Sequence, residues 1–457
     1  MTRRRQAAWP AMASAPASAA PRWRRWVARH IAVLLLAAAL PAVAADAGPP
    51  AAMTLRQALH AALTGNPELR NFAWDFKAQD ALAAQAARRP NPQLNAQAED
   101  FAGTGASRGF TGSEFSLSIS QALELGDKRR RRVELASEQR RLIEADRAIR
   151  QLDVVAEVAR CFIRVAADQE RSALAERAVA LATATRDEVQ KRVDAARSPL
   201  AEASRAGIQL ARARLDQQQV ARQLAGDRQR LAALWGDAAP AFGEVAAALY
   251  RLPAVDDYAR LREKLARNPD LSRFVSAARL REAELRLAIA QGVPNLTVEA
   301  GLRRNQDSDS QGLLFALQLP LTVNDRNRGN IDAARAERER LDADQAALAL
   351  RLSTELFALH QQLAQARAEV EGLEREILPR AHEALDQARY AWQRGRYGYL
   401  EWVDVQRELL VVERQHIDAA EQYHLQLAEI ERLTGEALAE ALPEPLPLPV
   451  ATGTPPP

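Results

Sequence analysis

The 457-residue sequence has one cysteine, few aromatic residues and, beyond its first 45 residues, no apolar run long enough to cross a bilayer as a helix. Cys161 cannot form an intramolecular disulfide, and no cysteine lies directly after the N-terminal leader to carry a lipid. We expect it to be a small buried hydrophobic residue. Aromatic residues make up 5% of the chain and alanine is abundant, a composition that favours long, closely packed helices over a large globular core.

The sequence also lacks the motifs of an enzyme. It has no glycine-rich phosphate loop, no nucleophile elbow and no HExxH motif. His416 and His424 lie near one face of a predicted helix, but they are too far apart to bind one ion. The histidines beyond the leader form no short metal-binding motif; they are His60, His360, His382, His416 and His424. We therefore expect no enzymatic activity, no cofactor and no metal site, so that any energy must come from a partner protein.

The first 45 residues contain seven arginines and no acidic residue. Without these seven charges the net charge of +3 becomes 3 − 7 = −4, so the remaining chain is mildly acidic. The leader has a basic region (PRWRRWVARH), a short apolar region (IAVLLLAAAL) and small residues with an Ala42-Val43-Ala44 site. This pattern predicts that residues 1–45 are a signal peptide rather than a membrane anchor, with Met1 or Met12 as the start.

Five short motifs recur in the same order, 198 to 202 residues apart. This spacing is far longer than a solenoid repeat, so it predicts two similar halves. We assign residues 46–236 to the first repeat, 237–256 to a linker, 257–436 to the second repeat and 437–457 to a proline-rich disordered tail. The motif pairs are NPEL at 66 with NPDL at 268, PQL at 92 with PNL at 294, FSLSI at 115 with FALQL at 315, GDKR at 126 with NDRN at 324, and LWG at 234 with LTG at 433.

Each half is predicted to contain a helix, two strands, a long helix and a shorter helix. The strands are placed at 93–101, 113–121, 296–303 and 312–320. Phe115, Leu117 and Ile119 alternate with serines, which is the pattern of a strand with one apolar and one polar face. Strands of eight to ten residues match the length that crosses a membrane in a barrel.

The long helices are predicted from sustained heptads of apolar and small residues, and residues 127–197 contain neither proline nor glycine. Pro379 should kink or break the second long helix. Shorter helices are expected at 199–235 and 399–435, with Ser198 as an N-cap, and helical segments at 54–89 and 257–291. The fold class is therefore mainly α with a small β part.

Four strands cannot close a barrel, and an open sheet edge cannot lie in lipid. Three chains would supply twelve strands, and the same threefold assembly would bundle the helices into a tube. The cations Lys128, Arg129, Arg130, Arg131 and Arg132 begin a long helix where a strand would leave the membrane. Contact with lipid phosphates and a solvated basic turn both fit this placement. Nuclear targeting does not fit behind an export signal.

Four stretches, taken together and in order, resemble the TolC-type outer-membrane efflux channels: LRQALHAALTGNPELR, RSPLAEASRAGIQLARARL, ILPRAHEAL and GRYGYLEWVDVQRELL. The second is similar to the cobalt-zinc-cadmium metal-efflux branch. The resemblance implies a homotrimer with duplicated halves, a twelve-stranded barrel in outer-membrane lipid and an α-helical tunnel in the periplasm of a Gram-negative bacterium. A periplasmic adaptor and an inner-membrane RND-type pump would be the partners, with no role for nucleic acid.

The resemblance also implies site residues. Glu401 and Asp404 correspond to acidic residues of a periplasmic constriction, and the helix-turn tips correspond to adaptor contacts. These tips are Arg197, Ser198, Pro199 and Leu200 in the first half, and Gly395, Arg396, Tyr397 and Gly398 in the second. The family often has glycine in the first turn, where this chain has Ala196-Arg197. Drug efflux and type I protein secretion remain alternatives to metal efflux, and a periplasmic adaptor or a coiled-coil scaffold are rival classes.

Overall fold

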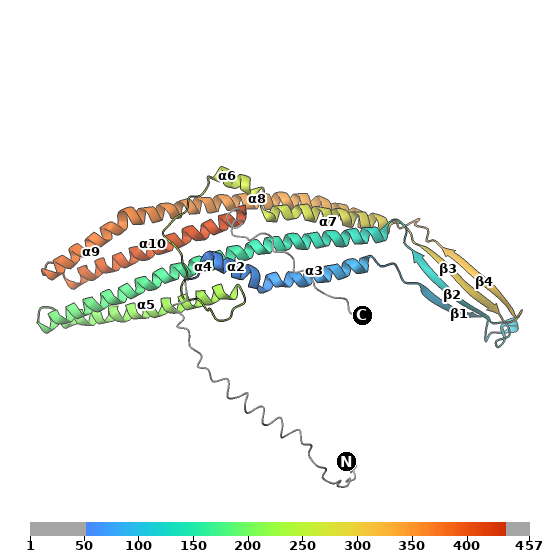
Figure 1. The fold of residues 1–457 in the computed structure, drawn as a ribbon, viewed down its shortest axis with the longest axis horizontal. Helices are drawn as coiled ribbons and strands as arrows, with labels where there is room; N and C mark the ends of the chain where they lie inside the picture. Colours follow the sequence, from blue (N-terminus) through green and yellow to red (C-terminus); the bar gives the residue numbers. More distant parts are fainter. Residues whose placement is uncertain (1–51, 436–457) are drawn as a thin grey trace, which may run out of the picture. The chain divides into compact units, whose positions relative to one another are not determined.

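The computed structural model describes residues 52–435. The predicted signal peptide and the predicted proline-rich tail lie outside this range. Long helices and four strands make up the described part, and their order repeats once along the chain (Figure 1). This order confirms the predicted fold class of mainly α structure with a small β part.

The first half contains α2 (Leu55–Gly65), α3 (Pro67–Ala86), β1 (Gln93–Glu99), a 3-10 turn (Gly105–Ser107), β2 (Glu114–Leu123), α4 (Lys128–Asp194) and α5 (Leu200–Ala233). The second half contains α6 (Tyr258–Leu265), α7 (Pro269–Gln291), β3 (Leu296–Asn305), β4 (Ser310–Gln318), α8 (Arg328–Gly372), α9 (Leu378–Gln393) and α10 (Tyr399–Thr434). Every element predicted between residues 54 and 435 is present, with ends shifted by a few residues.

The second long helix is interrupted before Pro379, as predicted. A π-helical turn, Leu373–Ile377, separates α8 from α9, and Pro379 lies in the first turn of α9. Proline has no backbone N–H and its ring excludes the carbonyl four residues earlier, so the regular ladder cannot continue through it. The uninterrupted helix of the first half, α4, has 67 residues.

In each half, one asparagine side chain forms hydrogen bonds that connect two helices. The side-chain oxygen of Asn66 accepts hydrogen bonds from two N–H groups at the start of α3, and its amide donates to the Leu234 carbonyl at 2.8 Å. Asn268 does the same at the start of α7 and donates to the Leu433 carbonyl at 2.7 Å. One side chain thus caps one helix and binds the end of another, which explains why NPEL and NPDL recur together with LWG and LTG.

The long helices also begin alike, but not at the positions that the repeat GDKR and NDRN suggested. Asp127 and Asn327 have left-handed backbones, with φ of 61° in both, and α4 and α8 start at the next residue. The structural equivalents are therefore 200 residues apart, whereas the sequence match paired Asp127 with Asp325. Aspartate and asparagine tolerate the left-handed region better than most residues, which accounts for their use at this corner.

The four strands form one antiparallel sheet in the order β1-β2-β3-β4, so β2 and β3 join the two halves (Figure 1). The register places apolar residues in rows across the sheet, and this face is exposed; Leu117 is 54% exposed and Leu313 is 89% exposed. Ser118 and Ser120, on the opposite face, are buried. The exposed apolar residues are Leu94, Phe115, Leu117, Ile119, Leu302, Leu313, Phe315 and Leu317.

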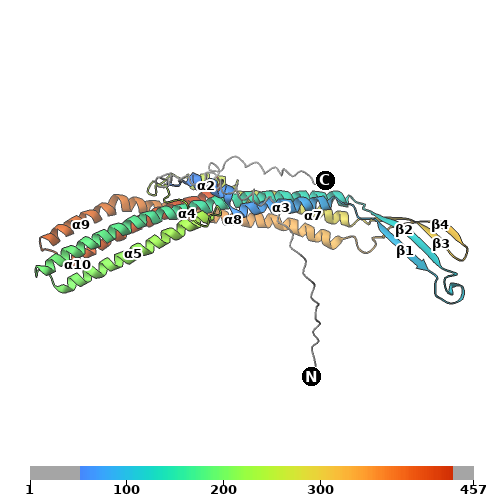
Figure 2. The same cartoon turned by 60° about the horizontal axis from the view of Figure 1, so that its bottom comes forward.

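The helices pack lengthwise around α4, which contacts α5, α7 and α10. Figures 1 and 2 show α5 beside α4 and α10 beside α9. Cys161 is buried among the apolar side chains of α2, α4 and α5, as predicted, and burial raises the pKa of its thiol to about 11.

Among residues 52–435, no helix combines the length and the apolar character needed to cross a membrane.

Candidate functional site

The two helix-turn tips have the same backbone geometry. Ala196 has φ 54° and Gly395 has φ 70°, and each directly follows the C-cap residue of a helix. The Arg197 N–H donates to the Arg192 carbonyl at 2.8 Å, and the Arg396 N–H donates to the Ala391 carbonyl at 2.9 Å. These are Schellman-type helix ends. Alanine at 196 therefore does not change the turn; it adopts the conformation that glycine adopts at 395.

The return helices start one residue later than a capping role for Ser198 requires. Pro199 is the N-cap of α5 and makes no side-chain capping bond, and Leu200 is the first helical residue. The prediction of Ser198 as the N-cap is therefore wrong by one position. Gly398 has the equivalent place before α10. Seven of the eight predicted tip residues are exposed, and Ser198 is half-buried.

An aromatic cluster joins the two tips from within. Trp392 of α9 and Trp402 of α10 stack with ring centroids 5.1 Å apart. The Arg192 guanidinium of α4 lies 3.9 Å from the Trp392 ring centroid and donates to the Trp392 carbonyl at 2.5 Å. Both indoles are buried. The end of α4 is thus held against α9 and α10, so the tips of the two halves are positioned together.

The predicted constriction residues lie at the start of α10, directly after the second tip. Glu401 and Asp404 are exposed in the first two turns of α10, three residues apart. They line a hollow of about 530 Å³ between α5 and α10. The same hollow is lined by three arginines that sequence reasoning missed: Arg205, Arg212 and Arg407. Arg205 and Arg212 are seven residues apart on α5, and this spacing is the signal that could have indicated them.

The basic run at the start of α4 is largely engaged within the chain. Lys128 Nζ lies 2.6 Å from the Asn295 side-chain oxygen, and Arg131 lies 2.8 Å from Glu134. Arg132 forms a two-fold contact with Glu124, directly after β2, and its hydrogen bond holds the pKa of that carboxyl below its usual range. The remaining two cations, Arg129 and Arg130, are exposed, and Arg130 pairs with Asp127 at 2.7 Å.

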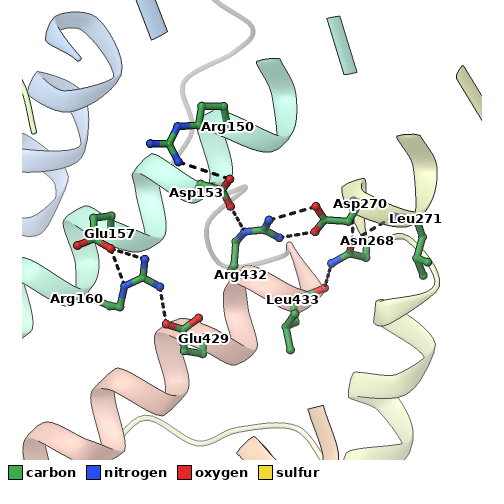
Figure 3. A network of polar contacts seen from close by, with 10 residues as sticks. All are labelled: Arg150, Asp153, Glu157, Arg160, Asn268, Asp270, Leu271, Glu429, Arg432 and Leu433. Carbon is green, nitrogen blue, oxygen red and sulfur yellow. Dashed lines mark hydrogen bonds and ion pairs between the residues drawn. The ribbon is translucent and has the colours of Figure 1, made fainter. Parts of the chain in front are cut away.

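Two arginines bind the halves together in the middle of the helices (Figure 3). Arg432 of α10 lies 2.7 Å from Asp153 of α4 and 2.8 Å from Asp270 of α7. Seven residues after Asp153 in α4, Arg160 forms ion pairs with Glu157 of the same helix and with Glu429 of α10. Figure 3 also shows Asn268 reaching the Leu433 carbonyl beside this network. The network fixes how α4, α7 and α10 meet.

The two histidines of α10 pack against the linker between the repeats. His424 Nε2 lies 2.8 Å from the Leu249 carbonyl oxygen, and the His416 ring stacks on Tyr250 with centroids 4.5 Å apart. Burial lowers the pKa of both imidazoles. Within the described range, no cluster of three or more histidine, cysteine or acidic side chains could hold a metal ion.

Comparison with known proteins adds sequence and structural relatives. Residues 58–237 and 261–436 match the family model described as outer membrane efflux protein. The cobalt-zinc-cadmium resistance protein CzcC of Cupriavidus metallidurans is 28% identical over 389 residues, which cover 85% of this chain and 91% of that protein. The nickel-cobalt-cadmium resistance protein NccC of Alcaligenes xylosoxydans xylosoxydans is 27% identical over 304 residues, which cover 66% and 68%.

The fold is similar to that of solved structures. A membrane protein from Pseudomonas aeruginosa superposes with a TM-score of 0.69 at 22% sequence identity. The matched region covers 83% of this chain and 90% of that structure.

Proposed function

Because the chain belongs to the outer membrane efflux protein family, we propose that it is the outer-membrane channel of a tripartite system that exports divalent metal cations. The protein is an outer-membrane efflux channel, with its helices in the periplasm. The finer parts of the proposal are its trimeric state, its partners and its substrate. It also includes removal of residues 1–45 as a signal peptide and the division into repeats at 46–236 and 257–436.

The sheet carries the proposal of a trimer. Within the described residues β1 pairs only with β2, and β4 pairs only with β3, so both edges of the sheet are free. Its exposed face is apolar and its other face is polar, which is the arrangement of a barrel strand with lipid outside and water inside. Free edges are too costly in lipid, so the sheet must continue into neighbouring copies. Three copies would supply twelve strands.

The tips support the proposal of a periplasmic adaptor as partner. Leu200, Tyr397 and Leu400 are 71%, 45% and 58% exposed, although each is a large apolar or aromatic residue. The tips lie at the ends of the helices remote from the strands (Figure 1). We propose that an adaptor contacts residues 197–200 and 395–398, and that an inner-membrane pump of the RND type supplies the energy.

Metal ions are the substrate that the relatives favour, because CzcC and NccC are resistance proteins for cobalt, zinc, cadmium and nickel. Threefold assembly would repeat Glu401 and Asp404 around the axis, and such a set of carboxylates attracts cations. We propose that both line the constriction. In each chain the same hollow is also lined by three arginines, which outnumber the two carboxylates. The charge near the proposed constriction therefore depends on guanidinium groups as well as on carboxylates.

Deletion of the gene tests the substrate. We expect the deleted strain to become more sensitive to cobalt, zinc and cadmium than to hydrophobic drugs, and a plasmid copy should restore tolerance. Unchanged metal tolerance together with new drug sensitivity would overturn metal efflux and favour the drug-efflux alternative. A defect confined to a secreted protein would instead indicate type I secretion.

A further inference from the structure

Two aspartates, one on each arm of the first helical hairpin, are buried at the same height. Asp168 of α4 and Asp227 of α5 are each 4% exposed, although aspartate is rarely buried unless it is paired. Asp168 lies 26 residues before Asp194, where α4 ends, and Asp227 lies 27 residues after Leu200, where α5 begins. Residues equally far from the turn of two antiparallel helices lie at the same height, because the rise per residue is the same in both.

The two aspartates also face each other across one apolar core. Val165 lies three residues before Asp168, on the same face of α4. Leu224 and Leu231 lie three and four residues from Asp227, on the same face of α5. These three apolar residues are buried in a single core between the two helices. The two carboxyls meet in this core and hydrogen-bond to each other, which two fully ionised carboxylates cannot do.

The pair lacks one donor. Asp227 has a donor at each oxygen, since Arg230 lies 2.7 Å from Oδ1 and the Gln223 amide lies 2.5 Å from Oδ2. Asp168 has one donor, Arg171, at 2.9 Å from Oδ1. Its Oδ2 atom is buried, and no group of residues 52–435 donates to it. A proton on this oxygen, donated to the Asp227 carboxylate, removes the cost of a buried oxygen without a donor.

The charges around the pair also favour a bound proton. Arg171 does not serve the pair alone, because its guanidinium also binds Asp418 and Glu421 of α10. Together with the pair, four carboxylates therefore face two guanidinium groups, those of Arg171 and Arg230. The Arg230 side chain is 66% exposed, so water screens its charge.

Other titratable groups on the elements packed here turn away from the pair. His416 and His424 of α10 contact the linker, and Glu170 of α4 accepts a hydrogen bond from Tyr250 of the linker. The Arg228 Nε atom of α5 is buried and makes no hydrogen bond to a described residue. The remaining charged or titratable side chains nearby are exposed: Arg56 and His60 of α2, Arg164 of α4 and Glu244 of the linker.

We propose that Asp168 and Asp227 share one proton, and that this proton makes the packing of α5 on α4 sensitive to pH. Burial, and next the hydrogen bond to Asp227, raise the pKa of Asp168 to about 6, and Arg171 acts in the opposite direction. An unfolded aspartate has a pKa of about 4, so the folded pair binds more protons than the unfolded chain between these values. The stabilising contribution is therefore complete in acid and is lost as pH rises through about 6.

Above that pH two ionised carboxylates repel each other in a buried contact, and α5 should separate from α4 more often. Cys161 reports this separation, because it is the one cysteine of the chain, is 5% exposed and packs in the core between the two helices. Burial, and in part the charge of Asp227, raise the pKa of its thiol, so it lies within electrostatic reach of the pair.

The labelling rate of Cys161 tests the proposal in the full-length mature protein in detergent. The probe is 4,4′-dithiodipyridine, which reacts with thiols in acid as well as at neutral pH. Each rate is divided by that of the same protein unfolded in guanidinium chloride at the same pH, which removes the pH dependence of the thiol itself. From about pH 5 to about pH 8 this ratio should rise about tenfold, as linkage requires for a pKa raised to about 6.

Three variants identify the groups responsible. In Asp168→Asn and in Asp227→Asn an amide supplies the missing donor and does not titrate, so the ratio should stay level with pH in both. Asp216→Asn is the matched control, because it removes an exposed carboxylate of the same helix α5 and should keep the response of the parent protein.

A level ratio in the parent protein would overturn the proposal. So would equal rises in the parent protein and in Asp168→Asn, because His416, His424 or another group would then cause the response. Far-ultraviolet circular dichroism at each pH verifies that the variants are folded, and Asp227→Asn decides the question if Asp168→Asn does not fold. The measurement needs neither substrate nor adaptor, so its outcome is independent of the proposed transport function.

Discussion

At the residue scale, the first tip holds an alanine in a conformation that suits glycine. Ala196 has φ 54°, and its counterpart in the second half is Gly395 with φ 70°. The left-handed region costs an L-residue about 1–2 kcal/mol, and it costs glycine almost nothing. The turn forms nevertheless, because the helix-end hydrogen bonds and the packing of Arg192 against Trp392 stabilise it enough to offset this cost.

Ala196→Gly should therefore stabilise the folded protein by about 0.5–1 kcal/mol, since relief of strain exceeds the entropy that glycine adds to the unfolded chain. The thermal midpoint of helical circular dichroism should rise. Gly395→Ala is the reciprocal change and should lower the midpoint. A fall in the midpoint for Ala196→Gly would show that the entropy glycine adds to the unfolded chain outweighs the relieved backbone strain.

The residues of the candidate site show how far sequence reasoning reaches. Glu401 and Asp404 could be indicated because they follow a turn at a fixed spacing. Arg205 and Arg212 could not be grouped with them, because α5 and α10 lie far apart in the sequence and only their packing brings these side chains to one hollow. The N-cap was predicted one position too early because proline is compatible with more than one position at the start of a helix. The sequence Ser198-Pro199 alone therefore left two helix starts open.

At the scale of elements, periodicity was sufficient for the helices and strands. Alternation over Phe115–Ile119 and heptads along the two long helices each select one structure. The loops between them are less regular, and the match of GDKR with NDRN was displaced by two residues because short polar motifs align in several ways. The left-handed residues Asp127 and Asn327 define the true equivalence.

The asparagine junctions also belong to this scale, and they yield a prediction. Asn268→Ala removes the cap of α7 and leaves the Leu433 carbonyl without its donor, so the protein should lose about 2–4 kcal/mol of stability. Asn268→Ser is the matched control, because serine caps a helix but is too short to reach Leu433. Its loss should be about half as large. Thermal unfolding measures both, and equal midpoints for the two variants would show that the interhelical bond contributes nothing.

At the scale of the whole molecule, the proposed assembly depends on a sheet that tolerates no extra atom at Gly301. A Cβ there would lie 2.5 Å from the Leu117 carbonyl oxygen and 2.7 Å from the Ser118 Cα. Gly312, which points to the same face, has nothing within 4 Å of its Cβ position. The two glycines are therefore a matched pair, one filled by neighbouring backbone and one open.

Gly301→Ala should destabilise the sheet by about 1–3 kcal/mol through overpacking and lower the yield of assembled channel. Gly312→Ala should leave it unchanged. Mass measurement in detergent should give three chains for the parent protein and for Gly312→Ala, and fewer assembled trimers for Gly301→Ala. A stable single-chain species of the parent protein would contradict the closure argument, whatever the glycine variants do.

The pairing of β2 with β3 has a consequence for the order of folding. Glu114 pairs with Asn305 and Leu123 pairs with Leu296, so these partners are separated by most of a repeat and by the whole of α4 and α5. If the chain enters the periplasm N-terminus first, β1 and β2 can at first form only an isolated hairpin. Such a hairpin is marginally stable in water, and this one has an apolar face. Late closure of so distant a contact is slow. The exported chain therefore has a long interval during which the apolar side chains of β2 need protection from aggregation, and this interval ends only when the second repeat arrives.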